Sequence, residues 1–446
     1  MKNKTSIMTL LLALLVVSNV QADNHRGAAE ETKTTLEGNN PAANAASNFV
    51  RDNSFNPSIS MIFDAKYQQF SADSSEITGF YIGHEAERAE QEGFGLDHTE
   101  FAVTANVDDK FRGSSVFAIA EHDGETELEL EEAYIETLPG FGLPSGMSVK
   151  VGRALWTLGY LNEHHLHTDD FADRPLPYRA FFDNHYNDDG AQVSYVLPTD
   201  LYTQIGAATL RGDDFPFGTS NDEGNEAWSA YARIGTDFGD NQSIRIGGYI
   251  LSGNTGAGRS LLSDTDEHAH EGEEEEEHEI AAMTFNGDSD LMIADVRYTW
   301  APTGNSSEKE VILQAEFFQR IEDGIYSITE GEGTNAVVDT IAFNDIDASG
   351  WYAQAVYKFA PQWRAGVRYS QLQSPDVPAD FYAEHDELNP AGFNPEAYSF
   401  MIDYSNSEFS RLRLQLNQEE LADGNEDTQV VLQYIMSIGA HSAHAY

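Results

Sequence analysis

"SISMIFDAKYQQF", residues 58–70, alternates apolar and polar side chains along the chain. The apolar side chains that share one face of an extended segment are Ile59, Met61, Phe63, Ala65 and Tyr67. The other face carries polar side chains, including Asp64 and Lys66. Because successive side chains of a β-strand point to opposite faces, this period of two predicts a strand with one apolar and one polar face.

The same alternation recurs along most of the chain. Clear examples are 100–107, 190–198, 226–238, 242–251, 291–300, 310–321, 350–359, 362–372, 397–404 and 410–417. Less regular segments are 112–121, 127–137, 146–156 and 200–210, and the last strand is expected at 428–440. Many of these strands are bounded by aromatic side chains such as Trp228, Trp300, Trp351 and Trp363. With residues 58–70 they make about sixteen predicted strands.

The links between these strands differ in length. Short links rich in Pro and Gly follow every second strand, at 108–113, 138–145, 197–200, 237–241, 301–307, 360–362 and 404–408. Most of the others are long: 71–97, 157–189, 212–226, 253–288, 322–348 and 374–395. Short turns at one end and long loops at the other are typical of outer-membrane barrels. We therefore predict an all-β fold, a transmembrane antiparallel β-barrel of about 16 strands, rather than a soluble sandwich or propeller.

The N-terminal residues predict export. Lys2 and Lys4 precede a short apolar run and a small residue, Ala22, which is the pattern of a signal peptide. We expect residues 1–22 to be the signal peptide, 23–56 a flexible periplasmic segment and 57–446 the barrel. The alternative, a retained anchor, is disfavoured because the run is too short to span a bilayer. The expected location is the outer membrane of a Gram-negative cell, in contact with lipid and lipopolysaccharide.

The charge of the chain excludes some partners. Its formal net charge is −50, so it repels nucleic acid and attracts cations. The absence of cysteine excludes disulfides and thiolate metal sites. No G-x-S-x-G motif or other recognisable nucleophile–base arrangement is present, and we do not expect an enzyme.

If lipid covers the apolar face, the polar face lines a pore, and sixteen strands leave room for an aqueous channel. The candidate pore-lining residues are Arg233, Arg245, Arg297, Arg364, Arg368, Arg411, Arg413, Asp295, Glu316 and Asp403. They are compatible with a hydrated wall of mixed charge. They are also compatible with a transverse field, in which arginines face carboxylates and orient small polar solutes.

Two loops combine imidazoles with carboxylates, a ligand set that suits Zn²⁺ and also Cu²⁺ or Ni²⁺. "DEHAHEGEEEEEHE", residues 266–279, holds His268, His270 and His278 among nine acidic residues. It is either a solvated anionic loop or a weak collector of divalent cations. The loop at 157–189 is either a constriction folded into the barrel or a brace at its mouth. Its candidate metal ligands are His164, His165, His167, Asp169, Asp170 and His185.

A resemblance supports a link to zinc. The run "GYLNEHHLHTDDFADRPLPYRAFF", the segments "DGAQVSYVLPTDLY" and "GAATLRGDDFP", and the ending "LQYIMSIGAHSAHAY" carry it. The chain resembles proteobacterial outer-membrane proteins usually labelled zinc-regulated TonB-dependent outer membrane receptors. Receptors of that kind have a plugged barrel of about twenty-two strands. Only about 34 residues separate the expected signal peptide from the first strand, so we expect a porin-like channel without a plug.

The predicted function is a porin-like channel for the acquisition of divalent metal, above all zinc, with acidic and histidine-rich loops that collect cations at its mouth. One alternative is a porin for small polar or anionic solutes without metal preference. Another is a surface metal-binding protein that does not conduct. We expect no tightly bound cofactor, with Zn²⁺ or another divalent cation as ligand. Porins of this size are commonly trimers, so a homotrimer is one of the assemblies that we expect.

Overall fold

The computed structural model describes residues 57–72, 75–80, 86, 92–96, 99–122, 125–218, 227–255, 259–260, 280–330, 337–375 and 390–439. It separates residues 1–54 from residues 55–446, and the description below concerns the second unit. The predicted signal peptide and the segment 23–56 lie outside the described residues.

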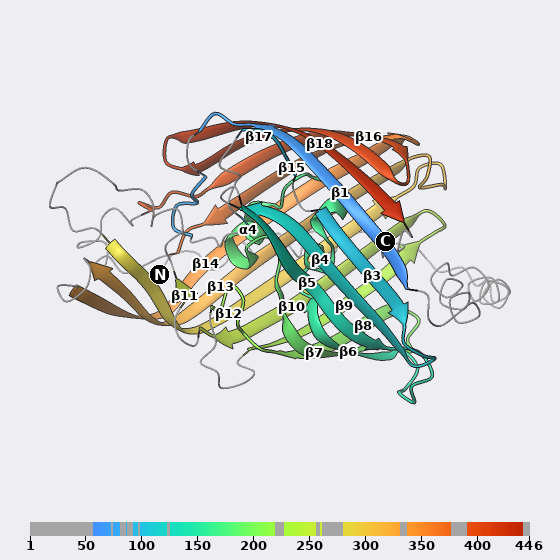
Figure 1. The fold of residues 1–446 in the computed structure, drawn as a ribbon, viewed down its shortest axis with the longest axis horizontal. Coiled ribbons are helices and arrows are strands. Elements are labelled where there is room, and N and C mark those ends of the chain that lie inside the picture. The colour runs from blue at the N-terminus through green and yellow to red at the C-terminus, as the bar shows by residue number, and fades with distance from the viewer. Residues whose placement is uncertain are drawn as a thin grey trace, which may run out of the picture. The chain divides into compact units, whose positions relative to one another are not determined.

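The described chain forms one antiparallel sheet that closes on itself (Figure 1). Its long strands are β1 (Ser58–Gln69), β3 (Thr99–Asn106), β4 (Phe111–His122), β5 (Glu125–Thr137), β6 (Met147–Leu155), β7 (Asn187–Val196), β8 (Tyr202–Leu210), β9 (Ala227–Phe238), β10 (Gln242–Asn254), β12 (Ile280–Trp300), β13 (Glu310–Glu330), β14 (Val337–Ala360), β15 (Trp363–Gln373), β16 (Glu396–Ser407), β17 (Ser410–Ala422) and β18 (Asn425–Gly439). Two short strands, β2 (Gly93–Leu96) and β11 (Arg259–Ser260), pair beside β1 and β12.

Closure comes from β1, which pairs with β3 on one side and with β18 on the other. Without the two short strands, the 18-stranded sheet is a wall of sixteen strands, each antiparallel to its neighbours. The predicted all-β, antiparallel barrel of sixteen strands is therefore confirmed.

The two faces of the wall differ as the alternation predicts. In β17, Leu412, Leu414 and Leu416 are exposed on the outer face. Arg413 and Gln415, which lie between them, are fully buried on the inner face. The barrel therefore presents apolar side chains outward and polar side chains inward.

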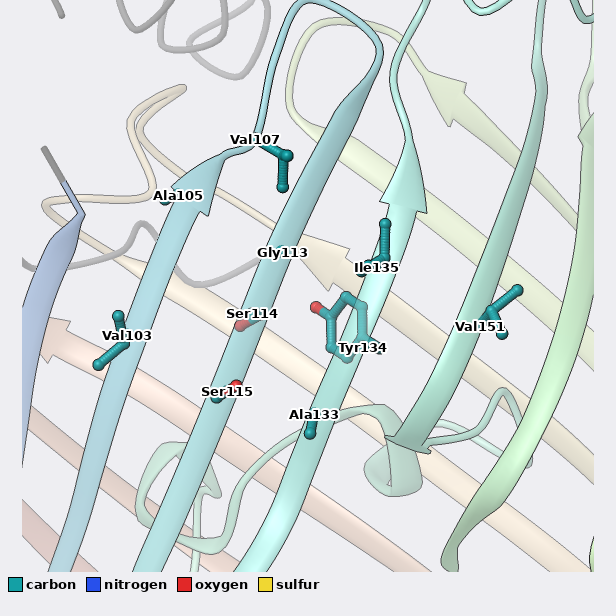
Figure 2. A pocket seen from close by; sticks show the side chains of 10 residues that line it. All are labelled: Val103, Ala105, Val107, Gly113, Ser114, Ser115, Ala133, Tyr134, Ile135 and Val151. Atoms are coloured by element: carbon teal, nitrogen blue, oxygen red, sulfur yellow. The ribbon is translucent and has the colours of Figure 1, made fainter. Parts of the chain in front are cut away.

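The outer wall is not uniformly bulky. Between β3 and β6 it has a shallow groove of about 420 Å³ lined by small and aliphatic residues, among them Val103, Ala133 and Val151 (Figure 2). No helix among the described residues is long and apolar enough to cross a membrane.

Two loop predictions need correction. The expected loops at 253–288 and 322–348 are partly strand, because β12, β13 and β14 are 21, 21 and 24 residues long. About ten tilted residues suffice to cross a bilayer, so these hairpins continue beyond it. Alternating residues such as Ile341 and Phe343 continue the pairing of β13 with β14.

The link between β6 and β7, residues 156–186, enters the barrel, and we call it the lumen loop. It contains two short 3₁₀ helices, Leu161–Glu163 and Leu166–Thr168, and the helix α4, Leu176–Phe182. Pro175 precedes α4, and Asp183, at a φ of 51°, ends it. Every residue of α4 is buried, and the helix packs against β13, β14 and β15. Figure 1 shows α4 surrounded by strands of the wall.

Aromatic packing holds α4 in place. The ring of Phe181 stacks on that of Phe318 in β13, with centroids 5.9 Å apart. Tyr178 meets the same ring edge-on at 5.1 Å. Part of the barrel interior is therefore an apolar core instead of a solvated pore, as burial of aromatic area favours.

Candidate functional site

Arginines of the wall hold the carboxylates of the lumen loop. Arg364 in β15 donates to Asp170 Oδ1 over 2.7 Å. Four residues further along the same strand and on the same face, Arg368 donates to Asp173 Oδ1 over 2.6 Å and to its backbone oxygen over 2.7 Å. Such charge-assisted bonds are stronger than neutral ones. They fix this part of the loop against β15.

Three more cations bind the backbone of the loop. Lys66, Arg411 and Arg413 each donate to a carbonyl oxygen within residues 167–172. The distances are 2.8 Å for Lys66 and 2.7 Å for Arg413. Since these bonds use backbone oxygens, they fix the path of the chain whatever its side chains are.

Tyr160 and Glu163, near the start of the loop, are held by a second group of arginines. Arg233 forms an ion pair with Glu163. The guanidinium groups of Arg245 and Arg297 lie over the ring of Tyr160, at 4.5 and 4.4 Å from its centroid. Both distances are within the range of cation–π attraction.

The ten predicted pore-lining residues thus lie on the inner side of the wall, but the idea of a solvated wall needs correction. Five of them are buried: Arg368, Arg413, Asp295, Glu316 and Asp403. Glu316, for example, accepts hydrogen bonds from Tyr178 and from the backbone N–H of Tyr160. Arg368, Arg413 and Glu316 anchor the loop. Asp295 and Asp403 instead pair with wall arginines that contact it, Arg245 and Arg364 among them.

A different part of the wall meets the loop through carboxylates. His165 Nδ1 lies 3.5 Å from Glu100 Oε2 in β3 and 3.3 Å from Glu131 Oε2 in β5. Its other ring nitrogen, Nε2, lies 3.3 Å from Glu132 Oε2. Within the described chain, Glu100, Glu131 and His165 form the group whose ligand atoms lie within 4.8 Å of one another, close enough to share a metal ion.

His167 completes this cluster. Its Nδ1 is hydrogen-bonded to Glu100 Oε1 at 2.7 Å. The rings of His165 and His167 stack with centroids 5.9 Å apart. His165 and His167, two positions apart in a His-x-His segment of the loop, therefore place both imidazoles at one site, together with carboxylates from two strands. We call Glu100, Glu131, Glu132, His165 and His167 the imidazole–carboxylate cluster.

A β-bulge explains how β5 contributes two neighbouring carboxylates. Val116 pairs with Glu132 and Phe117 pairs with Leu130, which leaves Glu131 as the extra residue. A bulge interrupts the alternation of faces. As a result both Glu131 and Glu132 are buried on the inner side, while Leu130 is exposed outside.

The cluster favours a positive charge at His165. Burial alone would lower the pKa of this imidazole, but Glu100, Glu131 and Glu132 raise it well above its ordinary value. The neighbouring His164 behaves in the opposite way. Burial lowers the pKa of His164 to about 4, and its ring stacks on Tyr160 outside the cluster.

The remaining predicted metal ligands lie elsewhere. Asp169 pairs with Arg174 at 2.7 Å, and Asp170 pairs with Arg364, so these two carboxylates bind arginines and lie outside the described group of shared ligand atoms. His185 is buried after α4 and does not belong to the described group of shared ligand atoms. The predicted ligands His268, His270 and His278 lie outside the described residues.

Sequence reasoning did not identify Glu100, Glu131 or Glu132 as candidate metal ligands. Glu100 starts the alternating segment 100–107, and its parity opposite the exposed Phe101 was a usable signal for the inner face. Nothing in the local pattern of β5 predicts the bulge that turns Glu132 inward.

A closed antiparallel wall with an apolar outside, a polar inside and an inward-folded loop defines the class of outer-membrane β-barrels. No family model matches the chain.

The chain is 29% identical over 420 residues to an uncharacterized protein of Aquifex aeolicus, covering 88% of this chain and 80% of that protein. Among solved structures it is similar to a loop L8 deletion mutant of OmpT, an outer membrane protein of Vibrio cholerae, with 11% identity, a TM-score of 0.49 and coverage of 86% and 100%. It is also similar to an anion-selective porin from Comamonas acidovorans, with 10% identity, a TM-score of 0.49 and coverage of 86% and 99%.

Proposed function

We propose that this protein is a porin-like channel of the outer membrane that takes part in the acquisition of divalent metal cations, above all zinc. The observation that carries the proposal is the imidazole–carboxylate cluster, because it gathers three carboxylates and two imidazoles inside the barrel. Anionic side chains inside a low-dielectric wall raise the local concentration of cations. The acidic segment 266–279 would add a collector of cations outside.

The pairing of the arginines also favours cations over anions as solutes. An anion-selective lumen needs arginines whose charge is available to the solute. In this barrel Arg364 and Arg368 are matched by Asp170 and Asp173 of the lumen loop. The alternative of a porin for anionic solutes therefore has weaker support than a cation pathway.

The test is the reversal potential of purified protein in planar bilayers under a gradient of zinc chloride. A cation pathway gives a reversal potential of the sign expected for Zn²⁺ permeation, and the effect weakens at high salt as mouth charges are screened. A variant that lacks residues 264–279 serves as the control for the external collector. A silent barrel, or one with anion selectivity, would refute the proposal.

A further inference from the structure

The geometry points to one coordinated metal ion between the wall and the lumen loop, bound by His165 Nδ1, Glu100 Oε2 and Glu131 Oε2. This inference deepens the proposed function and rests on it for its biological meaning. It adds a discrete site, with three protein ligands, to the general attraction of cations. It also makes that metal ion a tie between the loop and strands β3 and β5.

Two of the three distances between the ligand atoms match a tetrahedral ion, and all three ligand atoms lie within 4.8 Å of one another. Bonds from Zn²⁺ to nitrogen and oxygen are about 2.0–2.2 Å long, so two ligand atoms of a tetrahedron lie about 3.4 Å apart. His165 Nδ1 lies 3.5 Å from Glu100 Oε2 and 3.3 Å from Glu131 Oε2. Among the described residues, Nδ1 makes no hydrogen bond, although its solvent exposure is negligible. Its nitrogen therefore faces the two oxygens at coordination spacing. Without a metal, an ion pair of the protonated imidazole with Glu100 and Glu131 holds this arrangement, and a bound metal ion would take the place of the proton.

The surrounding groups orient these ligands as they do around metals in proteins. A metal-binding imidazole usually gives its second ring nitrogen to a carboxylate, which fixes the ring. Here Nε2 of His165 faces Glu132 Oε2 at 3.3 Å. Glu100 uses Oε1 for its bond with His167 Nδ1, which leaves Oε2 directed at His165. The two residues that orient the ligands, Glu132 and His167, thus both belong to the imidazole–carboxylate cluster.

The ligand set also defines the chemical class of the ion and its exchange. One imidazole and two carboxylates suit Zn²⁺ and similar first-row divalent ions, and are a poor match for the soft Cu⁺ ion. Three protein ligands leave a position for water, as in sites where the metal meets exchanging molecules. Such an ion can leave the site, which suits a stop along a transport path.

The ion would join parts of the chain that are far apart in sequence. His165 belongs to the lumen loop, whereas Glu100 is the second residue of β3 and Glu131 is the bulged residue of β5. Arginines hold the loop to β15. The metal would hold it to β3 and β5. Occupancy should therefore slow local opening of the loop, because a ligand that binds only the closed arrangement stabilises it.

The experiment is a titration of the full-length protein in detergent with Co²⁺, read from its visible absorption, followed by competition with Zn²⁺. We expect one site clearly tighter than the rest. His165→Gln and Glu131→Gln should each weaken it by at least about 100-fold, and Glu132→Gln by about 10- to 100-fold. His164→Gln is the matched control. It removes an imidazole one position away that contacts Tyr160, and it should leave the tight site unchanged.

Further readouts keep the test decisive. Glu131→Asp retains the charge but withdraws the ligand, so weaker binding in a barrel with normal heat-modified gel migration would support the site even if Glu131→Gln folds poorly. Hydrogen exchange of residues 157–175 should slow on addition of Zn²⁺ in the wild type and not in His165→Gln. Equal Co²⁺ binding by the wild type and by all ligand variants would overturn the site.

The failure of the site can be told apart from the failure of the channel. Tight Co²⁺ binding by a barrel that is silent in bilayers would retain the site and refute the transport role. Zinc permeation without a tight site would do the reverse.

Discussion

Replacing Arg368 with Gln should release the lumen loop from β15. The side chain of Arg368 is 4% exposed and donates to both the carboxylate and the backbone oxygen of Asp173. Gln is shorter and uncharged, so the carboxylate of Asp173 would keep only its neutral donors, Gln415 and Asn417. The side chain of Asp173 is 28% exposed, so it is a partly buried carboxylate that loses its cation, which costs free energy.

The size of the effect follows from known energies. Breaking a buried ion pair by removing one partner costs about 3–5 kcal/mol. Since Asp173 retains two hydrogen bonds and its side chain is 28% exposed, we take the lower end of this range as the upper bound, about 3 kcal/mol. At about 1.4 kcal/mol per tenfold change, this raises the population of locally open loop about 100-fold.

Hydrogen exchange of residues 157–186, measured by mass spectrometry on protein in detergent, reports this population. We expect exchange of the loop in Arg368→Gln to be faster by about two orders of magnitude, with unchanged protection of the barrel strands. Arg368→Gln combined with Asp173→Asn should recover part of the protection, because the double variant leaves no unpaired charge. In Arg211→Gln, which removes an arginine side chain that is 49% exposed, exchange should match the wild type. Wild-type exchange rates in Arg368→Gln would refute the anchoring role of this arginine.

The remaining predictions concern topology, the acidic loop and pH. A tag at Gly272 should be reachable on intact cells and one at Gly304 should be hidden, and labelling in the opposite sense would invert the barrel. Deleting 264–279 should remove several weak Zn²⁺ sites detected by calorimetry without unfolding the barrel, and this binding should fall between about pH 7 and pH 5.5 while Ca²⁺ binding stays level. Burial lowers the pKa of His164 to about 4 in the folded chain. Between about pH 6.5 and pH 4, this imidazole is therefore protonated in the unfolded chain but not in the folded chain. Stability should therefore fall as the pH drops from about 6.5 to 4, by up to about 3 kcal/mol, and thermal unfolding of His164→Gln should show a flatter pH dependence.

The fold could be predicted because its signal is local and repeated. Alternation in each strand identifies the face that points outward, as Leu412, Leu414 and Leu416 show in β17. Because lipid surrounds the barrel, the apolar face must be the outer one. Strand ends were less predictable. Strands β12 to β14 continue beyond the membrane, and no change in their sequence pattern indicates where contact with lipid ends.

The inner side could be predicted by residue type but not by partner. Parity places Arg364 and Arg368 inside, and that much is local information. Their counterions are Asp170 and Asp173, which lie 194 and 195 positions away from them in the chain. A carboxylate in a histidine-rich loop is an equally good metal ligand or arginine partner. Only the path of the loop across the barrel decides between the two.

The imidazole–carboxylate cluster shows why a site can exceed its sequence pattern. Strict alternation would send one of Glu131 and Glu132 into lipid, where an ionised carboxylate is very unfavourable. The bulge at Glu131 removes this conflict by turning both side chains inward. The bulge also interrupts the regular backbone pairing of β4 and β5 at one point, which costs free energy. Partners for both carboxylates inside the barrel offset this cost. His165 meets each of them, one through each ring nitrogen. The bulge and the His-x-His segment of the loop therefore make physical sense together, and neither does alone.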